Sequence, residues 1–165
     1  MIEVKATPEN LFWGYFDADT PPVAEINSGE TVMLHTLTAC FPEDLPPDSS
    51  LVTDDHKAAM EALTPGGDGS KVVAGPVGPH VMTGPIYVNG AEPGDTLQVD
   101  ILEAEPRQDW GFAAILPMLG TLPEEFTDYE RIHLMIDRVK GVATLPWGTS
   151  VPLDPFFGIM GVAPP

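Results

Sequence analysis

Short stretches of alternating apolar and polar residues run through the chain, and most are bounded by Gly, Pro or Asn. Residues 2–34 contain several such stretches, and a β-rich run at 31–37 follows a turn at 27–30. Residues 111–119 are apolar, and residues 130–145 contain two more stretches with strand character. A period of two residues is typical of strands with one buried face. The pattern therefore predicts a mostly β, sandwich-like fold with many short strands and Pro/Gly turns.

The segment 84–102 has the pattern of a β-hairpin. The residues that define its two strands are Ile86 and Val88, then Leu97, Gln98, Val99, Asp100 and Ile101. Between the strands, Pro93 and Gly94 suit the centre of a type II turn, because Pro fixes φ and Gly tolerates a positive φ. We expect the two strands to pair with each other.

One short helix is expected near residues 54–63. Thr53 or Asp54 can cap it, acidic residues fill its first turn, and Pro65 ends it. Residues 66–70 are then expected to form a mobile surface loop.

Composition narrows the class of protein. The 165 residues include 16 Gly and 19 Pro, which excludes a helical bundle. There are 25 acidic and 7 basic residues, for a net charge of −18, although only 19% of the residues are charged. The imbalance thus comes mainly from the scarcity of Lys and Arg. Such a surface repels phosphate backbones and anionic lipids, so we expect no nucleic-acid or membrane partner.

The single cysteine, Cys40, cannot form an internal disulfide, and we interpret it as a small buried residue. The N-terminal residues lack the basic and then apolar pattern of a signal peptide. No apolar run approaches the roughly 18 residues of a membrane span. These features predict a cytoplasmic protein.

Common catalytic and metal-binding motifs are absent from the sequence, and the four histidines do not stand at metal-ligand spacing. His80 is the main candidate, because it lies in a loop stiffened by Pro and Gly at 78–85. Its imidazole can donate a hydrogen bond, transfer a proton or bind a metal. The alternative is a loop histidine bonded to a backbone carbonyl.

The other histidines are given structural interpretations. His35 and His133 lie in strand-like runs and are expected to be structural. His56 lies in the first turn of the helix and is expected to be solvated.

Asp109 and Trp110 form a second candidate site. A Trp before a Gly in a loop can wall a pocket, although a core aromatic is the alternative. Asp109 can act as a general base or metal ligand, or simply form a turn.

Residues 83–95, TGPIYVNGAEPGD, closely resemble the acetamidase/formamidase family. Further runs agree with the family and keep its order, so the resemblance covers almost the whole chain. These runs are WGYFD at 13–17, DWG at 109–111, GTLP at 120–123 and PFFGIMGVAPP at 155–165.

The resemblance implies an enzyme that hydrolyses short linear amides, such as formamide or acetamide, to a carboxylate and ammonia. It also implies a β-rich, sandwich-like fold, a homo-oligomer and a divalent metal, zinc or calcium. Family members are longer than this chain, and their second half carries a Gly-Gly-Asn-Met-Asp run and an Asp/His/Gly-Asp-Gly-Glu cluster that look like metal ligands. Neither occurs here. We therefore expect residues 1–165 to be the N-terminal half of an acetamidase/formamidase-like domain.

Within that half, we assign His80 and Asp109 to catalysis and Trp110 and Thr83 to substrate binding. No residue of the chain is assigned to the metal. A second polypeptide, or the C-terminal half of the same protein, would supply the metal ligands.

The alternative function is a non-enzymatic β-sandwich module that acts in binding or assembly. The apolar residues Phe156, Phe157, Ile159 and Met160 distinguish the two hypotheses, because a self-sufficient module would cover them.

Overall fold

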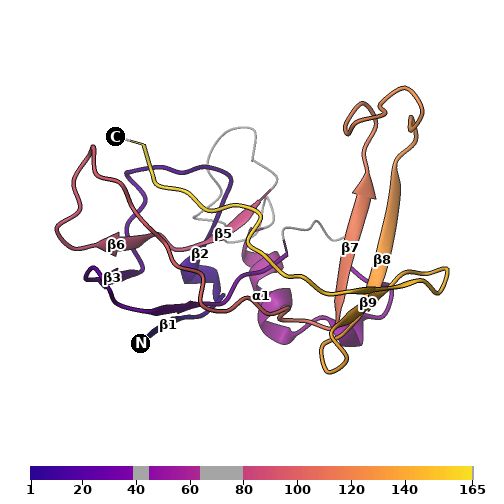
Figure 1. Cartoon of the computed structure of the whole chain (residues 1–165), viewed down its shortest axis with the longest axis horizontal. Helices are drawn as coiled ribbons and strands as arrows, with labels where there is room; N and C mark the ends of the chain where they lie inside the picture. The colour runs from indigo at the N-terminus through magenta and orange to yellow at the C-terminus, as the bar shows by residue number, and fades with distance from the viewer. Residues whose placement is uncertain (39–44, 64–79, 165) are drawn as a thin grey trace.

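The computed structural model describes residues 1–38, 45–63 and 80–164 (Figure 1). These residues form short strands, one α-helix and two 3-10 turns at Pro8–Asn10 and Ser49–Leu51, so the predicted mostly β fold is confirmed. The expected loop at 66–70 and Cys40 lie outside the described residues. The strands and helix are β1 Ile2–Val4, β2 Leu11–Trp13, β3 Ala24–Ile26, β4 Val32–Leu34, α1 Asp54–Leu63, β5 Val81–Thr83, β6 Ile86–Val88, β7 Trp110–Ile115, β8 Glu130–Asp137, β9 Val142–Thr144 and β10 Ser150–Pro152.

The strands of the described residues belong to four sheets. An antiparallel sheet in the order β10-β9-β8-β7 is built from neighbouring strands of the second half of the chain. The other three are two-stranded: β1 and β4 pair in parallel, β3 and β6 pair in parallel, and β2 and β5 pair antiparallel. Figure 1 shows α1 between the small sheets and the four-stranded sheet.

The helix contributes to two core clusters. Ala59 and Leu63, one turn apart on α1, pack with Ala6, Leu11 and Leu37. The second cluster centres on Val52 and Trp110, and Met60 of α1 packs against it. The helix therefore connects the small sheets to β7 through apolar burial on two sides.

Helix α1 agrees with its predicted bounds of 54–63. The backbone N–H of Lys57 donates a hydrogen bond to the Thr53 carbonyl at 3.0 Å, which places Thr53 at the cap position. The two strands expected within 130–145 are β8 and β9, and the apolar run after residue 110 is β7.

The predicted hairpin at 84–102 is wrong, although its turn is confirmed. The N–H of Asp95 donates to the Glu92 carbonyl at 3.0 Å, and Gly94 has a φ of +104°, as a type II turn requires. Strand β6 pairs instead with β3, in parallel register from Ala24 opposite Ile86. The expected second strand, at 96–102, has no strand assignment. Pairing with an earlier segment of the chain thus replaces the local partner that the alternation predicted.

Within the described ranges, no helix is both long and apolar enough to cross a membrane.

Candidate functional site

The four predicted site residues fall into two pairs on different sheets. His80 immediately precedes β5, which ends at Thr83 and pairs with β2. Asp109 and Trp110 lie at the start of β7 in the four-stranded sheet. Among the described residues, no hydrogen bond or ion pair joins the two pairs. The structure therefore places His80 with Thr83, and Asp109 with Trp110, but does not combine them in one constellation.

His80 is anchored by its backbone and exposed at its side chain. Its carbonyl accepts a hydrogen bond from the Gly14 N–H at 3.2 Å, which ties it to the WGYFD run. The residue is exposed to solvent. An exposed imidazole on a fixed backbone is accessible to a substrate or to a partner chain.

Thr83 is partly buried, and its hydroxyl bridges two segments. Its Oγ1 donates to the His35 carbonyl at 2.9 Å. A hydroxyl that donates its one proton still has lone pairs that can accept a hydrogen bond. Thr83 can therefore accept from an amide N–H without giving up this contact.

Asp109 is an exposed carboxylate in an ion pair. Its Oδ1 accepts a hydrogen bond from Nε of Arg138 at 2.7 Å, and both side chains are about half exposed. Its carbonyl accepts from the Ile136 N–H at 2.8 Å, so the backbone is fixed to the neighbouring strand. A carboxylate has two oxygens with several lone pairs, so Asp109 can accept a proton from a substrate or water while it keeps its contact with Arg138.

Trp110 lies in the core. The residue is 3% exposed and packs with Val52 and Phe112. Its Nε1 donates to Oε1 of Gln108 at 3.0 Å, and its ring stacks on His56 with the centroids 5.8 Å apart. This placement matches the core aromatic that was the alternative interpretation. Its substrate-binding role stays a prediction.

His56 corrects one expectation, because it is fully buried instead of solvated. Its Nδ1 lies 3.1 Å from the same Gln108 Oε1 that accepts from Trp110. Since Oε1 can only accept, Nδ1 of His56 carries the proton. Burial lowers the pKa of His56 below its ordinary value of 6.5, and the Arg107 charge lowers it too, against the raising effects of the Gln108 hydrogen bond and Asp55. The imidazole is therefore neutral at pH 7.

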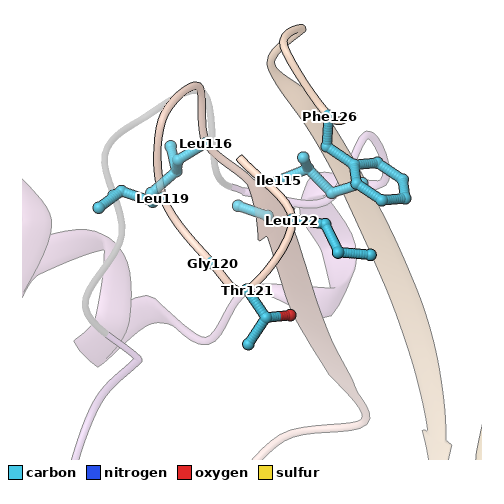
Figure 2. Close-up of a pocket in the computed structure, with 8 residues that line it drawn as sticks. Ile115, Leu116, Leu119, Gly120, Thr121, Leu122 and Phe126 are labelled. Atoms are coloured by element: carbon cyan, nitrogen blue, oxygen red, sulfur yellow. The ribbon is translucent and has the colours of Figure 1, made fainter. Parts of the chain in front are cut away.

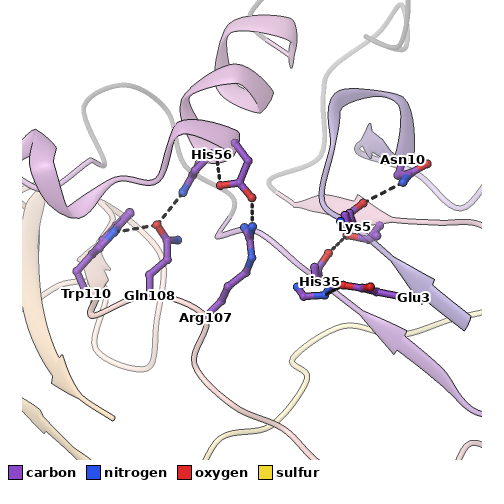
Figure 3. A network of polar contacts seen from close by, with 10 residues as sticks. Glu3, Lys5, Asn10, His35, His56, Arg107, Gln108 and Trp110 are labelled. Carbon is purple, nitrogen blue, oxygen red and sulfur yellow. Dashed lines mark hydrogen bonds and ion pairs between the residues drawn. The ribbon is translucent and has the colours of Figure 1, made fainter. Parts of the chain in front are cut away.

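Arg107 and Gln108, just before β7, form polar contacts with the first turn of α1 (Figure 3). Arg107 forms an ion pair with Asp55, and Gln108 bonds to His56. Burial raises the pKa of Asp55, but hydrogen bonds from Thr53, Arg107 and the His56 N–H, with the Arg107 charge, lower it by more. The net direction is downward, so Asp55 stays ionised. We call Asp55, His56, Arg107, Gln108 and Trp110 the helix clamp.

The sequence contained a signal for the buried His56. His56, Ala59 and Leu63 follow the spacing of one helix face, and all three are buried. A histidine on that face is expected to pack in the core, even when it lies in the first turn of the helix.

The remaining histidines lie in or beside strands. His35 follows β4, and its Nε2 lies 2.9 Å from Oε1 of Glu3 on β1, as Figure 3 shows. The His35 N–H also donates to the Val4 carbonyl at 3.0 Å. His133 lies in β8, opposite Phe112 of β7. The contacts of His35 join β1 to the segment after β4.

A hollow of about 280 Å³ lies between the end of β7 and the loop that follows it (Figure 2). Thr121 supplies the hydroxyl of a lining that is otherwise mostly aliphatic and aromatic, and no predicted site residue is part of it. Binding sites usually place several polar groups around an apolar pocket. The hollow therefore lacks the groups that amide hydrolysis requires. Its lining residues are Ala114, Ile115, Leu116, Leu119, Gly120, Thr121, Leu122 and Phe126.

Metal ligands are not gathered in the part of the chain that the structure describes. No group of three or more His, Cys, Asp or Glu residues in that part could hold an ion. Catalytic zinc sites commonly use three protein ligands, and calcium uses more oxygen ligands. The described residues therefore do not fit a metal centre.

Comparison with known proteins establishes the family. The model of the Acetamidase/Formamidase family matches residues 69–165, which is more than half of the chain. The chain belongs to the acetamidase/formamidase family, as its sequence runs predicted.

A solved structure agrees with this assignment. The crystal structure of an acetamidase from Bacillus halodurans is similar to 99% of this chain, with a TM-score of 0.67 and 27% sequence identity. The chain spans only 46% of that acetamidase. No curated protein matches the chain significantly.

Proposed function

We propose that this chain is the N-terminal portion of an amidase that hydrolyses short linear amides, such as formamide or acetamide, to a carboxylate and ammonia. The observation that supports this most strongly is the similarity of nearly the whole chain to an acetamidase at a TM-score of 0.67. Membership of the acetamidase/formamidase family supports the same class of reaction.

The proposed enzyme is active only with a complementary C-terminal segment, from a second polypeptide or from the same protein. The chain covers less than half of the similar acetamidase, which supports this proposal. The apolar segment at 156–160 supports it independently. Phe156 is 84% exposed, Met160 57%, Ile159 47% and Phe157 38%. These are the residues that a self-sufficient module would cover, so the exposure favours the amidase over the binding-module alternative.

His80 is the proposed catalytic group of this chain. Amide hydrolysis places negative charge on the carbonyl oxygen when water adds, and the leaving nitrogen needs a proton before it departs as ammonia. The exposed imidazole of His80 can donate a hydrogen bond to that oxygen or a proton to that nitrogen. Thr83, three residues later, can accept from the substrate N–H through its hydroxyl.

Asp109 and Trp110 have the weaker structural support. Asp109 can accept a proton from the attacking water through a lone pair that Arg138 does not use, but its carboxylate is held in an ion pair at the start of the four-stranded sheet, away from His80. Trp110 is buried, so a direct contact with substrate would require a rearrangement of the helix clamp. The buried and hydrogen-bonded side chain of Trp110 instead holds the backbone next to Asp109 in place.

Because the described residues do not fit a metal centre, we assign any divalent metal, zinc or calcium, to the complementary segment. Such a metal would lower the pKa of a bound water and so favour hydroxide at neutral pH. Oligomerisation, a cytoplasmic location and the lack of nucleic-acid or membrane partners stay predictions.

The test combines mass measurement with an activity assay. Native mass spectrometry defines the polypeptides in the purified sample, and ammonia release from formamide and acetamide is measured with and without a chelator. The proposal expects activity only where a second segment accompanies the 165-residue chain, and loss of activity with chelator. Full activity from a single 165-residue species would refute the need for a complementary segment. Binding without any amide hydrolysis in the complete assembly would favour the module.

A further inference from the structure

Residues 96–102 have the sequence of a strand but the surroundings of a loop. Leu97, Val99 and Ile101 alternate with polar Gln98 and Asp100. Within the part of the chain that the structure describes, this segment has no strand assignment and pairs with no strand. The only one of these residues outside the alternation is Leu102, which is 75% exposed.

Both faces of this segment are accessible to solvent. Every residue from 90 to 103 is exposed, and Leu97, Val99 and Ile101 keep 49%, 49% and 50% of their surface in solvent. Among the described residues, no backbone hydrogen bond involves 96–106. Within the described ranges, the segment therefore offers a row of backbone N–H and C=O groups without strand partners beside a row of apolar side chains.

An unpaired, apolar, alternating segment is a favourable template for strand addition. A second strand would satisfy the backbone groups and cover the apolar row at the same time. An isolated strand gains neither benefit, since its stability depends on cross-strand side-chain pairs. Strand β6 pairs with β3, and among the described residues it does not pair with 96–102.

We propose that residues 96–102 become a strand by pairing with an extended segment of the complementary polypeptide. This inference rests on the proposed function, because that function supplies the partner. The partner segment has apolar residues at alternate positions, to cover Leu97, Val99 and Ile101. Between them it has neutral or basic residues, since Asp100, which lies on the other face of the segment, would repel acidic ones.

The length of the similar acetamidase points to this occupant. More than half of that acetamidase lies outside the region that the present chain covers. A second copy of the chain fits less well. Antiparallel self-pairing centred on Val99 would place Leu97 opposite Ile101, but it would also place Asp95 opposite Glu103. Like charges directly opposite each other destabilise a strand pair, and the chain's net charge of −18 opposes self-association further.

Hydrogen exchange tests the pairing directly. The full chain is purified through a tag from its source cells, and the second polypeptide is identified by mass. Backbone exchange at 96–102 is then compared between this assembly and the recombinant chain alone. We expect fast exchange in the chain alone and protection by about 100-fold or more in the assembly.

Two matched variants separate the apolar row from the rest of the segment. Val99→Lys and Gln98→Lys add the same charge to neighbouring exposed positions, so neither should change the Tm of the chain alone. On recombination with the separated second polypeptide, Val99→Lys should weaken binding by about tenfold or more, because it removes apolar burial. Gln98→Lys should bind as well as wild type or better.

The outcomes distinguish this proposal from the proposed function. Unprotected amides at 96–102 in an assembly that hydrolyses amides would overturn the strand pairing and leave the function intact. Protection in an assembly that releases no ammonia would support the pairing and refute the function. Protection that rises with the concentration of the chain alone would show self-pairing and overturn the proposal. An assembly without a complementary segment, whether in a second polypeptide or in the same protein, would overturn it as well.

Discussion

The buried imidazole of His56 makes the stability of the chain depend on pH. Its ring stacks on Trp110, and its Nδ1–H donates to Gln108. Burial is the main cause of its lowered pKa. In the unfolded chain the ring is solvated and titrates near its ordinary value of 6.5. Below that pH the unfolded chain binds a proton that the folded chain does not.

The sign and size of the pH effect on stability follow from this difference in proton binding. Above the unfolded pKa of 6.5, His56 is neutral in both states and contributes no pH dependence. As the pH falls below 6.5, the free energy of unfolding should decrease by up to about 1.4 kcal/mol per pH unit, until the folded pKa is reached. The charged neighbours that face the ring are Asp55 and Arg107. Both keep their charge in this window, because the pKa of Asp55 is lowered from 3.8.

Urea unfolding from about pH 7.5 to about pH 5.5 measures this effect. The matched variant is His56→Phe, which keeps a ring against Trp110 and removes the titrating group. Gln108 Oε1 retains the Trp110 donor in this variant. The stability of wild type relative to His56→Phe should fall by up to about 1.4 kcal/mol over this range.

A stability difference that stays constant with pH, or that grows on acidification, would refute the buried, neutral His56. Because the two proteins share every other titrating group, other histidines and carboxylates cancel in this comparison.

Three further predictions concern single residues. Gly161→Ala should destabilise the chain by up to about 1 kcal/mol in thermal unfolding, because a Cβ there would lie 2.7 Å from Cζ of Phe16 and the exposed Phe16 ring would have to shift. Gly158→Ala is its control, with nothing within 4 Å, and equal Tm values for the two variants would contradict the close contact. His80→Ala should leave the Tm unchanged but reduce ammonia release by the complete assembly about 100-fold; unchanged release would remove His80 from catalysis. Asp109→Asn should lower the free energy of unfolding by less than about 1 kcal/mol, because the ion pair with Arg138 is exposed. The variant should therefore stay folded, and undiminished ammonia release by its assembly would show that Asp109 is not the base.

Local signals predicted the elements whose structure is local. The cap, acidic first turn and terminating Pro of α1 are all encoded within a few residues, and the helix has its predicted bounds. The turn at Pro93 and Gly94 has the same origin. The hairpin prediction was wrong because alternation does not identify the partner of a strand, and the expected second strand at 96–102 does not form. Strand β6 pairs with β3, a choice that depends on tertiary packing.

The same contrast between local and long-range signals applies to the candidate site. The sequence runs identified the family, and the comparisons confirm it. The contacts of Asp109 with Arg138 and of Thr83 with the His35 carbonyl join segments far apart in the sequence, so no local pattern contains them. The helix clamp was missed for a different reason. The spacing of His56, Ala59 and Leu63 did indicate a buried face, but the histidine's position in the first turn suggested solvent.

The most direct test of the proposed function is ammonia release from formamide and acetamide, measured on samples whose polypeptides are identified by native mass spectrometry. We predict no ammonia release above background from the 165-residue chain alone, and release from the assembly with its complementary segment. Full amide hydrolysis by a sample that contains only the 165-residue chain would contradict the proposal.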